Sequence, residues 1–299
     1  DLIPRLKTIA EVIGVDLVPS IHTDFVVDIA SKEFEDIANS LLDDEIYIVN
    51  LAAARFDFGA CAEDYLRLNV LCHESFLLFL SKLKIKKFVH ISSVAAIDGR
   101  KIKYKSDLNC DDAYRSTKHI QENSIREWCH KRKIDLSVLY PSAIFSNNAR
   151  QDTNIGKMQI FSKFIPFVPE INVKKSLTFL PNLSMFIVKN ITGNFSPGLY
   201  LTIERPIMSV TQMIIILSGR NLIKIRILGL KQILKIIAWN LFIIGFGKID
   251  FKLTPNRVEK LFSDTSYDDC FEEDIDCDIY NQQSHDDLIK LLMGYNKNI

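Results

Sequence analysis

The sequence predicts an α/β fold with a parallel sheet in its first half and a smaller lobe in its second half. Short runs of β-branched and apolar residues alternate with segments whose apolar residues recur at helical spacing. The loops between these segments are short, which is typical of parallel strands joined by right-handed helical crossovers. The length of 299 residues is enough for one large domain, or for a domain with a second lobe.

The first half gives the clearest order of elements. Residues 31–42 begin with Ser31 in the N-cap position, and Phe34, Ala38 and Leu41 follow at the spacing of one helix face. Strands are expected over residues 24–28, 45–51, 87–91 and 135–139, and two further helices over residues 65–83 and 114–131. The order strand, helix, strand, helix, strand predicts a sheet of parallel crossovers.

The second half is less regular. We expect a strand and then a helix over residues 176–190, a strand over 198–203, a helix over 210–217 and mainly helical structure over 222–247. The acidic segment from Ser263 onward is expected to be a solvated loop. We place the boundary between the two domains near residue 150, so that they span residues 1–150 and 151–299, with residues 172–205 returning to the first.

Composition excludes several classes of partner. The chain has 37 basic and 37 acidic side chains, and this net charge of zero argues against a nucleic-acid partner. Its six cysteines form no CxxC pair and its six histidines are scattered, so we expect free thiols, a cytoplasmic location and no metal. The apolar stretch 236–247 is too short for a bilayer, which needs about 20 residues. It predicts a buried helix and leaves peripheral membrane contact open.

Tyr114 and Lys118 form the first candidate for chemistry. They stand at positions i and i+4 of an expected helix and therefore share one face. A nearby ammonium stabilises a phenolate and lowers the pKa of a tyrosine, which makes the phenol a usable acid and base. This pattern alone is common on exposed helices, so it needs further support.

Three further features supply that support. Ser92 and Ser93 end the expected strand 87–91, and sites in parallel α/β sheets lie beyond the carboxyl ends of strands. The strand 45–51 leads into a turn of small residues that includes Leu51, Ala52 and Ala53. A third strand ends in a loop that contains Pro141 and Ile144.

Together these motifs resemble the extended short-chain dehydrogenase/reductase superfamily, which contains the NAD-dependent epimerases and dehydratases. The matching segments are Asp28-Ile29 after an early strand, NLAA at 50–53, Asn69 in the next helix, Ser92-Ser93, the YxxxK pair Tyr114 and Lys118, YPSAIFSN at 140–147 and LTFLPNLS at 177–184. The resemblance covers about residues 1–220 and implies a Rossmann-like, doubly wound sheet with a substrate-binding lobe.

The resemblance also implies roles for these residues. Tyr114 would be the acid and base, Lys118 would bind the nicotinamide ribose, Ser93 would bind the reacting oxygen, and Asn69 would support the site. Residues that contact the cofactor would be Asp1, Asp28, Ile29, Leu51, Ala52, Ala53, Ser92, Tyr114, Lys118, Pro141 and Ile144. The cofactor would be NAD, because Asp1 resembles the acid that binds the adenosine ribose, while Arg5 leaves NADP open.

The chain departs from the family pattern in two important places. None of its 11 glycines forms the GxxGxxG loop that binds the cofactor pyrophosphate. We therefore expect the chain to be a fragment that lacks about the first 30 residues of the domain. Val94-Ala95 also replaces the acidic pair of dehydratase members, which argues against a dehydratase.

Three functions remain open after these comparisons of motifs. The first is an oxidoreductase or epimerase that acts on a nucleotide-linked sugar, as enzymes of polysaccharide biosynthesis do. By analogy with such enzymes, it would be a homodimer formed through helices 65–83 and 114–131. The second is a dehydrogenase or reductase of a hydrophobic alcohol, as in the hydroxysteroid dehydrogenase branch. The third is a non-catalytic Rossmann scaffold, which the absent glycine loop suggests.

Overall fold

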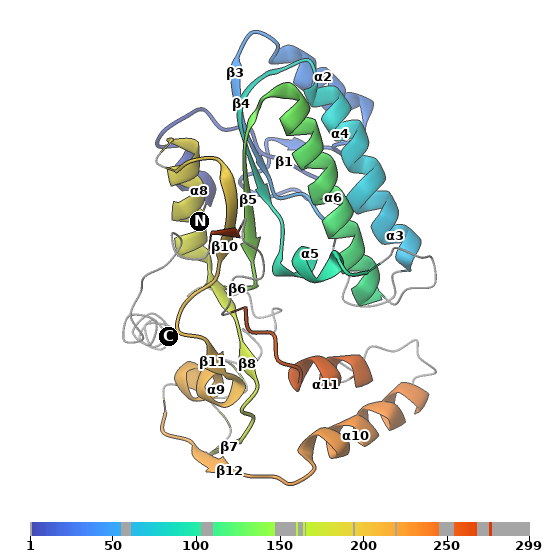
Figure 1. Cartoon of the computed structure of the whole chain (residues 1–299), viewed down its shortest axis with the longest axis vertical. Helices are drawn as coiled ribbons and strands as arrows, with labels where there is room; N and C mark the ends of the chain where they lie inside the picture. The colour runs from blue at the N-terminus through green and yellow to red at the C-terminus, as the bar shows by residue number, and fades with distance from the viewer. Residues whose placement is uncertain are drawn as a thin grey trace. The chain divides into compact units, whose positions relative to one another are not determined.

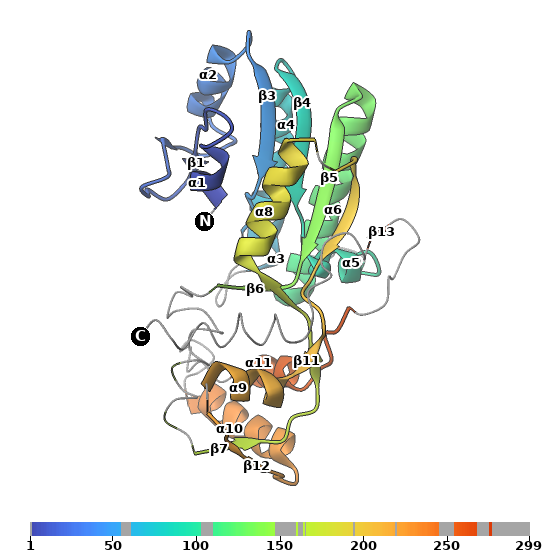
Figure 2. The same ribbon diagram turned by 90° about the vertical axis from the view of Figure 1, so that its left-hand side faces the viewer.

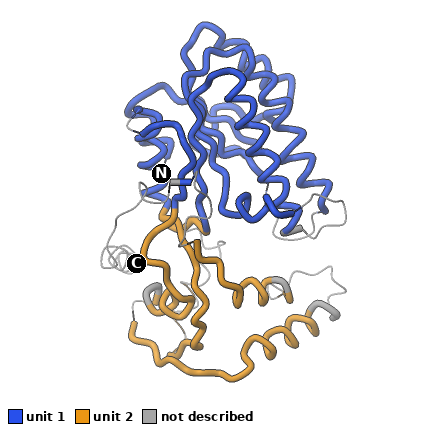
Figure 3. The backbone as a smooth tube through the Cα atoms, in the orientation of Figure 1, with its two compact units in different colours: residues 1–142, 180–202, 270–280 blue, residues 143–179, 203–269, 281–299 orange. Residues whose placement is uncertain are grey.

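The computed structural model describes residues 2–54, 61–102, 110–146, 160, 164, 166–193, 195–218, 220–244, 254–267 and 275–276. The chain divides into two compact units (Figure 3). Unit 1 contains residues 1–142, 180–202 and 270–280, and unit 2 contains residues 143–179, 203–269 and 281–299.

A five-stranded parallel sheet forms the centre of unit 1 (Figure 1). Its strands in spatial order are β13 (Ile275–Asp276), β10 (Gly198–Thr202), β5 (Asp135–Pro141), β4 (Lys84–Ile91) and β3 (Glu45–Asn50). Every neighbouring pair in this sheet is parallel. The predicted α/β fold class with a parallel sheet is therefore confirmed.

Helices cover both faces of this sheet (Figures 1 and 2). One face carries α2 (Lys32–Ser40), α4 (Cys72–Leu80) and α6 (Cys110–Arg132), and the other carries α8 (Leu180–Ile191). Successive side chains of a strand point to opposite faces. In β4, Phe88 packs in a core cluster with Phe76 and Leu80, whereas Val89 packs in a second cluster with Phe186 and Ile187. Burial on both faces explains why Phe88, Val89 and Ile91 at the end of this strand are apolar without a polar-apolar alternation of period two.

The remaining elements of unit 1 are short. They are α1 (Leu2–Leu6), the parallel pair β1 (Val15–Asp16) and β2 (Phe25–Val26), α3 (Ala62–Leu66), and α5 (Val94–Gly99). The predicted cap of α2 is confirmed, because the Ser31 hydroxyl accepts a hydrogen bond from the Phe34 N–H. The helix predicted over residues 65–83 starts earlier and ends earlier, because a continuous helical segment runs over residues 62–80, with a π-helical turn at Arg67–Leu71 that joins α3 to α4.

The described residues of unit 2 form short strand pairs and helices. The pairs are β6 (Ala143–Phe145) with β9 (Leu177–Phe179), β8 (Lys174–Lys175) with β11 (Met208–Ser209), and β7 (Phe167–Pro169) with β12 (Ile223–Ile225). The helices are α9 (Val210–Ser218), α10 (Leu230–Ile244) and α11 (Pro255–Leu261). No described helix has the length and apolar character needed to cross a membrane.

Two predictions for unit 2 need correction. The described part of residues 222–247 is mainly helical, as expected, through α10, but residues 223–225 form a strand, because the isoleucines of Ile-Lys-Ile-Arg-Ile alternate with a period of two. The helix over 236–247 is also not buried as expected, since Ile236 is 62% and Trp239 is 53% exposed. One side of α10 forms ion pairs with Glu259 through Lys231 and Lys235, and the isoleucines on its other side face solvent.

Candidate functional site

The candidate site lies where β3, β4 and β5 end. Asn50 of β3 is in register with His90 of β4, and Ile91 of β4 is in register with Leu139 of β5. The three strand ends therefore lie side by side, and the turn after β3, the Ser92-Ser93 pair and Pro141 leave the sheet at the same edge. In open parallel sheets this edge is where ligands bind.

Lys118 brings helix α6 to this edge. Its side chain is 1% exposed, and its Nζ donates a hydrogen bond to Gln121 Oε1 at 2.6 Å and a longer one to the carbonyl oxygen of Ile91 at 3.4 Å. Ile91 directly precedes the serine pair, so the ammonium lies at the carboxyl end of β4. Burial lowers the pKa of Lys118 to about 8, while the charge of Glu122 acts in the opposite direction.

Tyr114 lies one helical turn before Lys118. It is half-buried, and its ring meets the buried ring of Tyr65 edge to face, with 5.9 Å between the ring centroids. This contact orients the phenol by packing, as edge-to-face aromatic pairs do. A half-buried phenol one turn from a buried ammonium is an arrangement that can exchange a proton with a bound hydroxyl group.

The two adjacent serines have different partners. Ser93 is the N-cap of α5, and its hydroxyl oxygen accepts a hydrogen bond from the Ala95 N–H at 3.2 Å. This bond uses the oxygen and leaves the hydroxyl proton of Ser93 available to a ligand. Ser92 is buried, and its hydroxyl donates to Glu122 Oε2 at 2.8 Å.

Helix α5 packs very closely on α6, and Gly99 makes this possible. A Cβ at Gly99 would lie 2.1 Å from the carbonyl oxygen of Arg115, which is too short for any side chain. Arg115 directly follows Tyr114 in α6. The absence of a side chain at Gly99 therefore sets the distance between the helix that Ser93 caps and the helix that carries Tyr114.

Asn69 holds the small-residue turn after β3. It is fully buried in the π-helical turn, and its Oδ1 accepts from the Ala54 N–H at 2.7 Å while its Nδ2 donates to the Ala54 carbonyl at 3.2 Å. Nδ2 also donates to the Thr117 hydroxyl at 3.3 Å, which joins the turn to α6. Asn50 adds a bond from the Ala52 N–H to its own Oδ1 at 3.0 Å. π-helical turns occur often at functional sites.

The other residues expected to contact a cofactor have varied positions. Leu51 and Ala53 are exposed and Ala52 is half-buried in the turn after β3. Asp28 accepts a hydrogen bond from the Ala30 N–H at 2.9 Å, and Ile29 packs on the core cluster beneath α2 and α4. Pro141 is buried at the end of β5, Ile144 belongs to unit 2, and Asp1 lies outside the described residues.

Sequence reasoning missed three buried polar residues beside Lys118. Gln121 Nε2 donates to the carbonyl oxygen of Ala52 at 3.1 Å and lies 2.7 Å from His73 Nε2, so it joins the small-residue turn to Lys118. Burial and the charge of Lys118 lower the pKa of His73 to about 4. Glu122 is 0% exposed. The helical spacing of three and four residues after Lys118 is the signal that could have identified Gln121 and Glu122.

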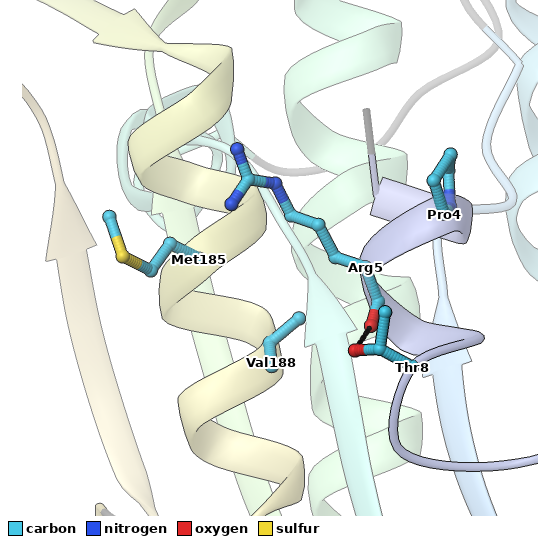
Figure 4. A pocket seen from close by; sticks show the side chains of 5 residues that line it. All are labelled: Pro4, Arg5, Thr8, Met185 and Val188. Atoms are coloured by element: carbon cyan, nitrogen blue, oxygen red, sulfur yellow. Dashed lines mark hydrogen bonds between the residues drawn. The ribbon is translucent and has the colours of Figure 1, made fainter.

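A surface hollow of about 510 Å³ lies elsewhere in unit 1, between α1 and α8 (Figure 4). Its lining consists of Pro4, Arg5, Thr8, Met185 and Val188. Arg5, which the sequence analysis relates to the choice between NAD and NADP, lines this hollow. Among the described residues, no cluster of three or more His, Cys, Asp or Glu side chains could hold a metal ion.

The residues at the strand ends fit one half of a dinucleotide cofactor. Lys118 has three N–H donors, and its two hydrogen bonds above leave one for a ribose hydroxyl. The exposed small residues after β3 allow close approach of a ligand to the backbone. The glycine-rich motif that would bind the pyrophosphate does not occur in these 299 residues.

Comparison with solved structures supports the fold. UDP-glucuronic acid 4-epimerase from Bacillus cereus, in complex with NAD, is 18% identical with a TM-score of 0.57, over 75% of this chain and 80% of that one. UDP-N-acetylglucosamine 4-epimerase from Methanobrevibacter ruminantium M1 is 17% identical with a TM-score of 0.56, over 71% and 75%. UDP-N-acetylglucosamine 4-epimerase from Bacillus cereus is 13% identical with a TM-score of 0.56, over 71% and 75%. At such identities the likeness shows a shared fold.

Comparison with protein families gives the membership. No curated protein sequence matches this chain significantly. The NAD-binding family described as male sterility protein matches residues 29–185, which is more than half of the chain. This match spans the small-residue turn, the serine pair and the Tyr114–Lys118 helix. The protein therefore belongs to the NAD-binding male sterility protein family, within the extended short-chain dehydrogenase/reductase superfamily.

Proposed function

We propose that this protein is an NAD-dependent oxidoreductase or epimerase that acts on a hydroxyl or ketone group of a nucleotide-linked sugar. The observation that carries the proposal is the buried Lys118 ammonium at the end of β4, one helical turn from Tyr114. The fold that it shares with sugar nucleotide epimerases supports the substrate class. NADP remains the alternative cofactor, since one similar structure is a complex with NADPH.

The residues of this chain would manage the proton in this reaction. A bound nicotinamide supplies hydride acceptance and return. Tyr114 would take the proton of the sugar hydroxyl during oxidation and return it during reduction. The Lys118 ammonium, one helical turn from Tyr114, would hold the ribose with its remaining N–H donor. Ser93 would donate its hydroxyl proton to the reacting oxygen while the Ala95 N–H fixes its position.

The test is a Tyr114→Phe variant of the protein. We expect turnover of a panel of UDP-sugars to fall at least about 100-fold, because removal of a positioned acid and base costs about that much. Interconversion of the sugars is followed by NMR, with NAD and with NADP. Tyr47→Phe is the matched control, because Tyr47 is 48% exposed on β3. Normal turnover in Tyr114→Phe would remove Tyr114 from the mechanism.

A second candidate function is reduction or oxidation of a hydrophobic alcohol. Unit 2 exposes many large apolar side chains, among them Ile223, Ile225 and Ile236. The arginines Arg220, Arg226 and Arg257 of unit 2 favour the nucleotide-linked sugar instead, because guanidinium groups suit its diphosphate. Long-chain and steroid alcohols in the same panel distinguish the two substrate classes. A chain that binds neither NADH nor NADPH would leave the non-catalytic scaffold as the remaining function.

We also propose that the protein is a homodimer that uses α4 and α6. Leu71 and Leu78 are 50% and 66% exposed, and their spacing of seven residues puts them on one face of the α4 segment. Large exposed apolar side chains at helical spacing are typical of a helix that packs against a partner.

A further inference from the structure

Glu122 is a fully buried carboxylate that the proposed mechanism does not use. It lies in α6, one helical turn after Lys118, and is 0% exposed. A buried charge is costly unless it is paired and hydrogen-bonded. Its surroundings therefore need an explanation.

Four side chains surround this carboxylate. Ser92 donates to Oε2 at 2.8 Å, and Tyr140 donates to Oε1 at 2.6 Å. Arg100 Nη2 and Arg126 Nη1 each lie 3.6 Å from Oε1, and Arg100 also donates to the Tyr140 hydroxyl at 3.3 Å. Glu122 therefore joins the residue after β4, a residue of β5, the residue after α5 and its own helix.

These partners stand next to the proposed catalytic residues. Ser92 precedes Ser93, Tyr140 precedes Pro141, and Arg100 follows Gly99 at the close contact between α5 and α6. A change at Glu122 would loosen the end of β4 on which Ser93 stands. The Glu122 carboxylate therefore contacts the serine pair through Ser92, and it also lies one helical turn after Lys118.

We propose that Glu122 is a positioning residue of the Tyr114–Lys118 site, which fixes the Ser92-Ser93 strand end and places a negative charge one helical turn from Lys118. This inference rests on the proposed function for its effect on turnover. Its effect on Lys118 is a property of the protein without substrate and can be measured separately.

The charges around Lys118 determine the direction of the effect. His73 of α4 and His90 of β4 face it, and burial lowers the pKa of both imidazoles, so both are neutral near pH 7. From α6 itself, Gln121 accepts a hydrogen bond and Glu122 raises the pKa of Lys118 against the effect of burial. Loss of the Glu122 charge would therefore lower the pKa of Lys118 further below about 8.

The first experiment measures the titration of Lys118 without substrate. Lysine ¹³Cε signals are followed by NMR against pH in the wild type and in Glu122→Gln, with Lys118→Arg used to assign the signal. We expect the midpoint to fall by about half a pH unit or more in Glu122→Gln, since a nearby opposite charge shifts a pKa by about that amount or more. Glu127→Gln is the matched control, because Glu127 lies in the same helix but is exposed and paired with Lys131. An unchanged midpoint in folded Glu122→Gln overturns the electrostatic role.

The second experiment measures turnover against pH in an active preparation. We expect the alkaline limit of kcat/KM to move to lower pH in Glu122→Gln, because the ammonium is lost at lower pH. Ser92→Ala keeps the charge of Glu122 and removes one hydrogen bond, and it remains informative if Glu122→Gln does not fold. It should lower turnover about tenfold without moving the Lys118 midpoint. If Ser92→Ala turns over at the wild-type rate, the positioning role is overturned. If the wild type is inactive but the Lys118 midpoint shifts as expected in Glu122→Gln, only the proposed function is contradicted.

Discussion

Single residues of the candidate site differ in how well the sequence could predict them. Tyr114, Lys118 and Ser93 belong to short local motifs, so spacing along the chain was enough to select them. Gln121 and His73 are 48 positions apart, and their contact exists only because α4 and α6 pack beside each other. The cluster beside Lys118 depends on such long-range contacts, which no local pattern reveals.

His73 gives a prediction for the pH dependence of stability. The unfolded chain binds a proton at this imidazole near pH 6.5, whereas the folded chain binds it only near pH 4. Between these values the unfolded state binds more protons, so the free energy of unfolding falls as the pH falls from 6.5 to 4. This depressed pKa corresponds to about 3 kcal/mol. Buried His90 acts in the same direction.

The measurement is chemical denaturation of wild type and His73→Gln between neutral and acidic pH. Trp128 reports on unit 1, because its ring packs on Phe88 with 6.2 Å between the centroids. We expect His73→Gln to lose less stability across this range than wild type. Exposed His130→Gln is the control and should follow the wild-type curve. Equal slopes for wild type and His73→Gln would contradict this account.

Elements were predictable where one period dominates the sequence. The end of β4 has apolar residues that pack on both faces of the sheet, and α2 has both a cap and an apolar face. Both elements form, although β4 begins at Lys84, three residues before the predicted start. The π-helical turn at Arg67–Leu71 was not predictable, because the sequence pattern there is that of an ordinary helix. The turn has a local function in the structure, since it positions Asn69 to bond both backbone groups of Ala54.

The contact between α5 and α6 gives a prediction at the scale of elements. Alanine favours a helix over glycine by about 1 kcal/mol, so propensity alone would make Gly99→Ala stabilising. The new Cβ would however lie 2.1 Å from the Arg115 carbonyl oxygen, and α5 would have to move. We expect a net loss of about 1–3 kcal/mol, as for other overpacked contacts.

Thermal unfolding and turnover are measured together for Gly99→Ala. Turnover should also fall, because displacement of α5 moves its N-cap Ser93 relative to Tyr114. Gly198→Ala is a suitable control, since the three atoms nearest to its Cβ would all belong to the Tyr200 side chain, the first at an ordinary 3.4 Å. A stabilised and fully active Gly99→Ala would show that the two helices can separate at no cost.

At the scale of the whole molecule, the NAD-binding family match and the parallel sheet agree with each other. The family match spans residues 29–185 and the fold is shared with sugar nucleotide epimerases, yet the glycine-rich motif does not occur in the chain. Motif order was sufficient to predict the parallel sheet, because each strand end carried a recognisable turn. Unit 2 was less predictable, since its strands have only two or three residues and show little periodicity.

The proposed dimer gives the prediction at this scale. A charge placed at Leu78, which is 66% exposed on α4, would have to be buried if this face packs on a second copy of the chain. Burial of an unpaired charge is strongly unfavourable, so Leu78→Glu should convert the dimer to a monomer. Light scattering after size-exclusion chromatography measures the mass, which for one chain is 34.3 kDa. Leu42→Glu is the control, because Leu42 follows α2 and is 39% exposed. A wild-type mass of one chain would contradict the dimer, and a dimeric Leu78→Glu would place its interface on another face.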